Sequence, residues 1–295
     1  MSTINKVPAN AGAEWLLRGF ALLRKAPVAL GTLGLIWGLL SLLGVQLMAF
    51  NASLGMVVQL GLALMGPLLF AGLLWAVHEV ENDRPALPAH LLHAVRSERT
   101  GSVLSTLLPQ VIAAVVLGVL LLVMVGPTQL QQLAEVMVKL QETAQAGGQP
   151  DPELMRSLPV GRLFLWMLML IAAAISVSLV TFVAVPEIIF GGCSGLEAMR
   201  NSFRACVHNL GAMVVFYLLM LVSLFAITFT VQLLAMMVQL VAGPGAAIWV
   251  ANLLMMAVLM PLLAGAVYHA WRQMLGASQA TVGSEVTAPA SHFEA

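Results

Sequence analysis

The chain carries little charge for its length. Only 9% of its 295 residues are Asp, Glu, Lys or Arg, whereas 60% are hydrophobic; about a quarter of the residues in soluble domains are charged. Thirteen basic residues balance thirteen acidic ones, so no net charge attracts nucleic acid, and we expect no nucleic-acid partner. The composition excludes a water-soluble fold, because no such fold could bury this much apolar surface.

Residues that carry catalytic chemistry are also scarce. The chain has only two cysteines, Cys193 and Cys206, and neither a glycine-rich phosphate loop nor a nucleophile elbow. No spacing of His, Cys, Asp or Glu matches a familiar metal site. We therefore expect no enzymatic activity, no cofactor and no metal.

Six long apolar stretches are present. Each is long enough to cross the hydrocarbon layer, which takes about 20 helical residues. None has an ionisable side chain near its middle, which argues against an ion-coupled pump. We predict an all-α, polytopic integral membrane protein with six transmembrane helices in three hairpins. It forms a single domain over residues 1–276, followed by a disordered tail over 277–295; the predicted spans are 28–49, 54–77, 103–125, 163–185, 212–236 and 247–268.

The basic residues predict the orientation of these spans. Of the thirteen Lys and Arg residues, all but Lys139, Arg156 and Arg162 fall on one side. Positively charged connections are retained in the cytoplasm, so both termini should lie there. The histidines fall on the same side, where we expect them to be solvated: His78, His90, His93, His208, His269 and His292.

An amphipathic helix is predicted directly before the fifth span. Ser194 and Glu197 have the spacing of a capping box, which marks a helix start. From there Arg200, Arg204 and His208 recur every four residues and form one face. The apolar residues form another face: Leu196, Met199, Phe203, Val207 and Leu210. Such a helix lies flat at the lipid headgroups with its apolar side toward the hydrocarbon.

The segment before the first span has the same design. Trp15, Leu16, Phe20 and Leu23 supply its apolar side. Together the two segments provide the candidate contacts for anionic headgroups: Arg18, Arg24, Lys25, Arg200 and Arg204.

These two segments also align with each other. Matching Glu14 to Glu197 places Phe20 on Phe203 without a gap, and the residues after Pro67 resemble those after Pro261. The segment 88–99 precedes the middle hairpin in the same way. We interpret this as an internal repeat of three units, each an interfacial helix plus a hairpin; chance similarity among apolar sequences is the alternative.

Several residues within or next to the spans favour close packing or bends. Gly34 and Gly38 form a small-residue notch in the first span, as Ala114 and Gly118 do in the third. Amide and hydroxyl side chains inside the spans are read as packing contacts, with a polar translocation path as the alternative. Glu187 is expected at headgroup level. Kinks that shape a cavity are considered at Pro67, Pro109 and Pro261.

Three motifs carry a resemblance to a known family. They are the residues from Trp15 through Pro27, the run Ser202-Phe203-Arg204-Ala205-Cys206 with Asn209, and the residues from Pro261 to Gly276. Together they resemble an uncharacterised family of proteobacterial six-span inner-membrane proteins, and more remotely the membrane domain of some glycerophosphodiester phosphodiesterases. The resemblance implies a bacterial inner-membrane location. The phosphodiesterase activity is not carried over, because this chain lacks a soluble phosphodiesterase domain, and the resemblance implies no catalytic residues.

The leading functional hypothesis is a non-enzymatic multi-pass protein that organises lipid or membrane partners through its interfacial helices. Its expected partners are the bilayer, through anionic headgroups, and a second membrane protein or another copy of the chain. A small-molecule or lipid transporter or channel is the main alternative, and an integral membrane enzyme comes third.

The charge pattern gives a direct test of topology. A fluorescent protein fused after Ala295 should fluoresce, and alkaline phosphatase fused there should be inactive, because both outcomes require a cytoplasmic C-terminus. Fusions within residues 146–158 should give the opposite pair of results. Phosphatase activity from the fusion after Ala295 would contradict the predicted orientation.

Overall fold

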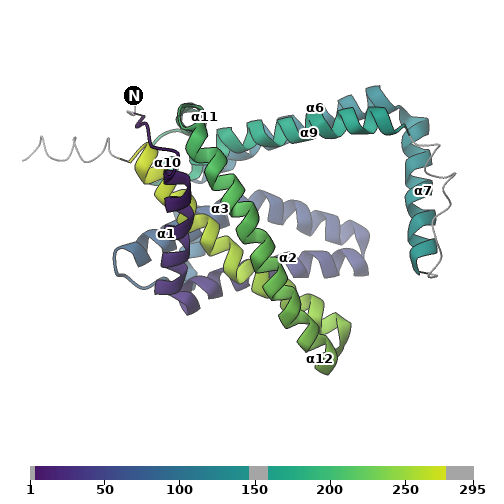
Figure 1. Cartoon of the computed structure of the whole chain (residues 1–295), viewed down its shortest axis with the longest axis horizontal. Coiled ribbons are helices and arrows are strands. Elements are labelled where there is room, and N and C mark those ends of the chain that lie inside the picture. The colour runs from purple at the N-terminus through teal and green to yellow at the C-terminus, as the bar shows by residue number, and fades with distance from the viewer. Residues whose placement is uncertain (1–3, 146–158, 277–295) are drawn as a thin grey trace, which may run out of the picture. The chain divides into compact units, whose positions relative to one another are not determined.

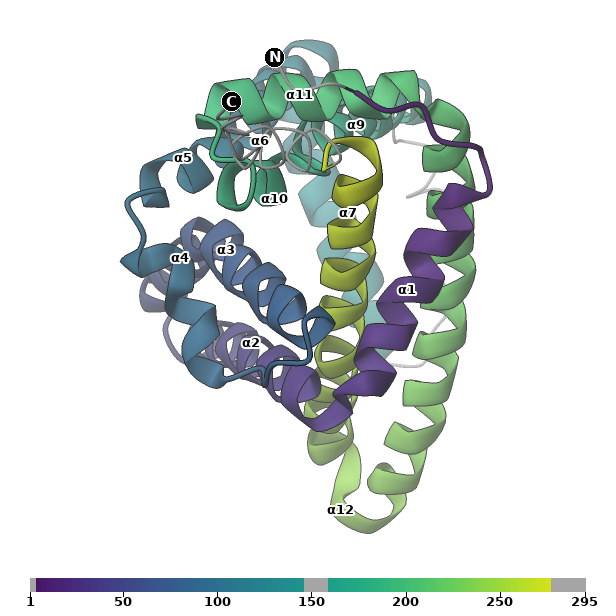
Figure 2. The same ribbon diagram turned by 90° about the vertical axis from the view of Figure 1, so that its left-hand side faces the viewer.

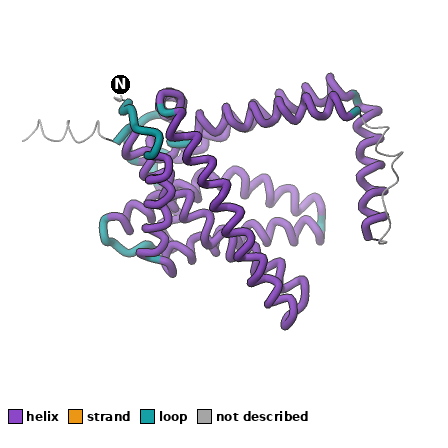
Figure 3. The backbone as a smooth tube through the Cα atoms, viewed as in Figure 1, coloured by secondary structure: helices purple, strands orange, loops and turns teal. Residues whose placement is uncertain are grey.

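The computed structural model describes residues 4–145 and 159–276, and the tail expected over 277–295 lies outside them. In these two ranges every regular element is a helix (Figure 3). The prediction of an all-α fold is confirmed. Five helical segments are long and apolar enough to cross a membrane: Pro27–Phe50, Ala52–Glu81, Thr100–Val125, Val160–Ile189 and Leu210–Met274.

The chain forms two compact units. Of the described residues, one unit comprises those up to Leu107 and those from Leu179 to Gly276, and the other comprises those between Leu108 and Ser178. The smaller unit holds α6 (Leu108–Val125), α7 (Pro127–Gln145) and most of α9 (Val160–Thr181). In it the indole Nε1 of Trp166 donates to the carbonyl oxygen of Leu117 at 3.0 Å and joins α9 to α6. The single domain expected over 1–276 stays a prediction.

The larger unit begins with α1 (Ala11–Lys25), α2 (Pro27–Phe50) and α3 (Ala52–Glu81), all labelled in Figure 1. α2 and α3 form the tight hairpin that the sequence predicts. Asn51 joins them in an extended conformation, and its side chain accepts a hydrogen bond from the backbone N–H of Leu54 at 3.0 Å. This bond satisfies one of the free N–H groups at the start of α3.

The last long helix, α12 (Leu210–Met274), consists of two arms. Its backbone is non-helical at Gly243, with φ 82° and ψ 172°, a conformation open to glycine but unfavourable for residues with a Cβ. Figure 2 shows α12 folding back on itself. The helix break predicted at Gly243 is therefore confirmed, and the fifth and sixth predicted spans are the two arms of α12.

Glycines let helices of the larger unit approach closely. A Cβ added to Gly34 would lie 2.7 Å from the Cα of Ala257, and one added to Gly38 would lie 3.1 Å from the Cβ of Met256. The notch in α2 thus packs against the second arm of α12, inside the same chain. Gly118 of α6, by contrast, has no described atom within 4 Å of an added Cβ.

Two of the three prolines that were considered as kinks do not interrupt their helices. Pro67 lies inside α3 and Pro261 inside α12, and both helices continue through them. Pro109 is the second residue of α6. The chain before it forms α5 (Thr100–Leu104) and the 3₁₀ turn η2 (Ser105–Leu107) instead of a regular helix, because Pro109 has no N–H to donate to the carbonyl of Ser105, four residues earlier, and its ring crowds that carbonyl.

The segment 88–99 is not one amphipathic helix, so this part of the expected repeat is wrong. It forms the 3₁₀ turn η1 (Pro88–Leu92) and the single α-helical turn α4 (His93–Arg96). Leu91 is buried against α3, where a Cβ on Gly72 would come within 2.5 Å of the Leu91 Cα. The conformation of this segment is therefore determined by its burial against α3 and not by helical periodicity.

The expectation that α1 turns Trp15 and Leu16 toward lipid is also wrong. Trp15 is 0% exposed, and its ring packs beside those of Phe182 and Phe216. α1 crosses both arms of α12. Gly12 contacts the backbone of the first arm at Ala212, and Gly19 contacts the backbone of the second arm at Leu262. Trp15 and Leu16 are therefore covered by protein, whereas Phe20 on the same helix stays 36% exposed.

The crossing of α1 over α12 predicts a glycine-specific loss of stability. A Cβ at residue 19 would lie 2.6 Å from the carbonyl oxygen of Leu262, whereas one at Gly66 meets no atom within 4 Å. Gly19→Ala should lower the free energy of unfolding by about 1–3 kcal/mol through overpacking. Gly66→Ala, the matched control, should cost nothing. Thermal unfolding of the detergent-solubilised protein measures both, and equal midpoints would refute the close contact.

Candidate lipid-facing site

The helix α11 (Gly195–His208) links α10 (Ala184–Ile189) to α12. It begins after Ser194, as predicted, and Ser194 has the extended backbone of an N-cap residue. Its side chain makes no capping hydrogen bond, so the proposed capping box is wrong. What anchors α11 instead is Ser202, whose hydroxyl donates to the Leu179 carbonyl at 3.0 Å and accepts from the Val183 N–H at 3.2 Å.

One face of α11 is buried and consists mainly of small residues. Ala198, Ser202, Ala205 and Cys206 are each 0% exposed. Small side chains let α11 lie close to its neighbours, and they leave its larger apolar residues on a different face.

A second face of α11 is apolar and exposed. Leu196 is 77% exposed, Phe203 44% and Val207 43%. These residues lie seven and four apart, so they form one stripe along the helix. We call Leu196, Phe203, Val207 and Leu210 the apolar stripe. Met199, which the sequence placed on the same face, is 5% exposed and belongs to the buried side.

A third face is basic and lies beside the apolar stripe. Arg200, Arg204 and His208 recur every four residues, and all three are exposed. Among the described residues, neither arginine takes part in an ion pair. We call these three residues the basic row. The guanidinium groups of Arg200 and Arg204 are available to an anion from outside the chain.

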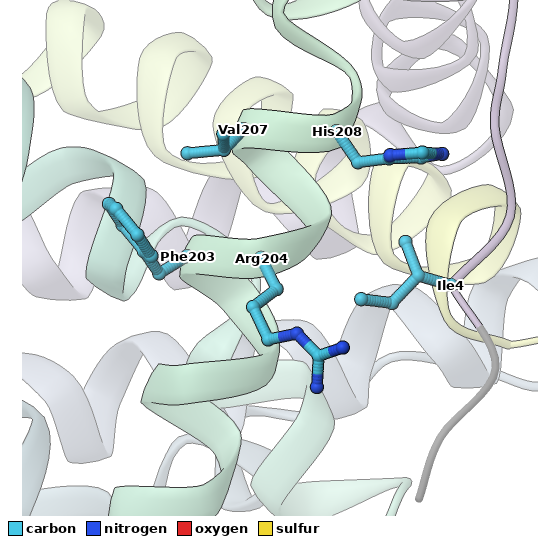
Figure 4. A pocket seen from close by; sticks show the side chains of 5 residues that line it. All are labelled: Ile4, Phe203, Arg204, Val207 and His208. Carbon is cyan, nitrogen blue, oxygen red and sulfur yellow. The ribbon is translucent and has the colours of Figure 1, made fainter.

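A groove of about 540 Å³ runs along this part of α11. Arg204 and His208 extend toward Ile4 of the N-terminal segment, whereas Phe203 and Val207 point to the other side of the helix (Figure 4). Asn209 holds that segment in place: its Oδ1 accepts from the Val7 N–H at 2.8 Å, and its Nδ2 donates to the Asn5 carbonyl at 3.0 Å. Polar and apolar walls therefore meet in one groove.

The remaining predicted headgroup residues lie on α1. Arg18 and Arg24 are exposed there. Lys25 binds Asp83, with 2.7 Å between Nζ and Oδ1, so its charge is already partnered. Only Arg204 of the five candidates lines the groove, and Arg200 lies one turn away on the same helix. Ile4 was missed because an isolated isoleucine before the first helix gives no periodic signal.

Glu187 was expected at headgroup level and not buried, but only 3% of its surface is exposed. The indole Nε1 of Trp271 donates to its Oε2 at 2.7 Å, and the Asn201 amide donates to its Oε1 at 3.3 Å. The Cys193 thiol also donates to Oε1, at 3.4 Å. A buried carboxylate is costly without such partners. These bonds connect α10 with α11 and α12, and thus fix the base on which α11 lies.

Several histidines expected to be solvated are instead packed. His78 lies 2.8 Å from the Tyr268 hydroxyl through Nδ1, and His269 is 8% exposed. The His93 ring stacks on Trp75 with 4.0 Å between centroids, and burial lowers the pKa of His93. Within residues 4–145 and 159–276, no group of three or more His, Cys, Asp or Glu side chains could hold a metal ion.

The five long apolar helices give this chain the architecture of a multi-pass membrane protein. Comparison with protein-family models, with curated proteins and with solved structures found no match.

We call Glu187 and its three donors, Trp271, Asn201 and Cys193, the Glu187 cluster. This cluster predicts that the thiol of Cys193 is unreactive. Burial, then the negative charge of Glu187 and the hydrogen bond to it, raise the pKa of Cys193 to about 11. Because the thiolate is the reactive form, alkylation by N-ethylmaleimide should be slow at pH 7 and rise about tenfold per pH unit until pH approaches 11. Glu187→Gln removes two of these causes and should speed the reaction at pH 8.

Cys206 provides the internal control, because it is 0% exposed and burial raises its pKa to about 12. It should stay unlabelled in the folded protein, as mass spectrometry of the modified peptides would show. An unchanged or slower reaction of Cys193 in Glu187→Gln would contradict the assigned cause.

Proposed function

We propose that this chain is a non-enzymatic multi-pass protein that binds anionic lipid headgroups along α11 and so organises lipid or membrane partners. The observation that carries the proposal is the pairing of an exposed apolar stripe with an exposed basic row on a helix whose third face is fixed to the protein. The stripe can enter the hydrocarbon boundary while the basic row stays at phosphate level.

The same geometry distinguishes α11 from a freely moving amphipathic segment. Ser202 and the Glu187 cluster hold α11 against α10 and α12. An anchored helix loses little conformational freedom when it binds a headgroup, so more of its binding energy remains as affinity. Arg204 and His208 in the groove supply donors suited to a phosphate.

The proposed setting is a bacterial inner membrane, crossed six times if each arm of α12 spans it, with both termini in the cytoplasm. Support for the topology comes from the bias in Lys and Arg. The resemblance to proteobacterial six-span proteins supports the location.

An internal duplication of the α1 and α11 units belongs to the same proposal. With Glu14 matched to Glu197, five pairs of positions are buried in both helices: Gly12 with Gly195, Trp15 with Ala198, Leu16 with Met199, Gly19 with Ser202, and Leu22 with Ala205. The two helices thus present equivalent faces to the protein. In α11, small residues on that face leave the larger apolar ones for lipid.

The second candidate function is a small-molecule or lipid transporter or channel. A cavity between the arms of α12, in whose mainly apolar wall Thr228, Gln232, Gln239 and Asn252 are set, favours it. Flux of a labelled solute or lipid across proteoliposomes would support this candidate if it required the protein and changed with substitutions in that cavity.

Removing two charges from the basic row tests the lipid proposal. Each basic residue at an anionic surface contributes about 1 kcal/mol, so Arg200→Gln with Arg204→Gln should weaken phosphatidylglycerol binding roughly 30-fold. Phosphatidylcholine binding should not change. Native mass spectrometry of the purified protein with added lipid gives both affinities.

A charge-matched control is Arg96→Gln with Lys139→Gln, since both residues are exposed and lie outside α11. It should bind phosphatidylglycerol as the wild-type protein does. Equal losses in the two double variants would show a general charge effect, and no loss in the α11 variant would overturn the proposal.

A further inference from the structure

A cavity of about 490 Å³ lies between the two arms of α12, far along the chain from the groove at α11. Its lining includes Pro244, next to the Gly243 turn, so it lies toward the end where the arms meet. Figure 2 shows the two arms and the turn that joins them. The volume falls within the range of about 300–1,000 Å³ that small-molecule sites occupy.

The cavity exists because small residues face it. Ala235 and Ala247, one from each arm, are 4% and 5% exposed and line it together with Ala251. Leucines at such positions would fill the space between two packed helices. In a helix that is otherwise rich in Leu, Met and Val, these alanines leave room for a bound molecule.

Amide and hydroxyl groups from both arms line this space. Thr228, Gln232 and Gln239 come from the first arm and Asn252 from the second. The Oδ1 atom of Asn252 is shielded from solvent and accepts no hydrogen bond from any residue that the structure describes. A shielded acceptor in an apolar surrounding is unfavourable until a donor reaches it.

Of the residues that the structure describes, none that lines the cavity is ionisable. A charged ligand would lose its hydration here without meeting an opposite charge. A free polar solute would gain nothing from the methionine and alanine walls. The surroundings therefore favour an uncharged molecule with an apolar tail and at least one O–H or N–H group.

We infer that the cavity between the arms of α12 binds a neutral amphiphile, whose head donates a hydrogen bond to the Oδ1 of Asn252 and whose tail lies along the apolar wall. The inference does not depend on lipid binding by α11, and neither site shares a lining residue with the other.

The test uses a monoacylglycerol that carries a photoactivatable diazirine, because this probe is neutral, has hydroxyl donors and has one apolar tail. The full-length protein is reconstituted in nanodiscs and illuminated, and the labelled peptides are identified by mass spectrometry. Labels should concentrate on residues 228–256. Unlabelled monooleoylglycerol should compete, whereas oleate and free glycerol should not.

Three variants sharpen the test. Asn252→Leu removes the acceptor and should reduce labelling of residues 228–256 about five- to tenfold. Ala251→Phe fills the cavity and should abolish it. Ala226→Leu changes an exposed position on the same helix and should label as the wild-type protein does. If Asn252→Leu is not monodisperse on gel filtration, Thr228→Val takes its place, with a smaller decrease expected.

Three outcomes would overturn the inference. Labels spread evenly over all apolar helices would mean bulk lipid contact. Competition by glycerol alone would mean an aqueous solute. A change of self-association in Asn252→Leu with unchanged labelling would mean an interface between copies. None of these outcomes would alter the headgroup affinity measured for the basic row, so the two proposals fail separately.

Discussion

A single buried carboxylate holds the base of the candidate lipid-facing site. Glu187 accepts hydrogen bonds from Trp271 near the end of α12, from Asn201 in α11 and from Cys193 between α10 and α11. Between membrane helices there is little hydrophobic driving force, because lipid tails are as apolar as leucine. Polar contacts and close backbone approach therefore decide how such helices associate. In this chain the larger unit has both: the polar contacts are those of Glu187, and the close backbone approach is that of α1 to α12 at Gly12 and Gly19.

This arrangement explains how one sequence pattern serves two purposes. α1 and α11 are both amphipathic, yet α1 turns Trp15 into the protein core and α11 leaves Phe203 outside. The difference comes from the size of the residues on the inward face. α1 places an indole there, whose Nε1 donates to Gln273 at 2.8 Å. α11 places alanine and serine there, so its larger apolar side chains remain free.

Much of the fold follows from local signals in the sequence. Runs without charge predict the long helices, and Gly243 next to Pro244 predicts the break in α12. Periodicity cannot show whether lipid or protein covers an apolar face, so the environment of Trp15 was missed. The burial of Glu187 was missed because Trp271 is 84 residues away in the chain. The basic row was predictable, since its residues repeat every four positions, but the Ile4 wall of the groove depends on contacts distant in sequence.

The contact between Trp15 and Gln273 joins positions 258 residues apart. A ribosome that adds roughly 5–20 residues per second needs roughly 10–50 s to make the partner of Trp15 after Trp15 itself has emerged. During that interval the nascent α1 has no second arm of α12 to cover it. Its amphipathic surface must wait at the membrane boundary or on a chaperone, so the final packing of the first helix is a late event in biogenesis.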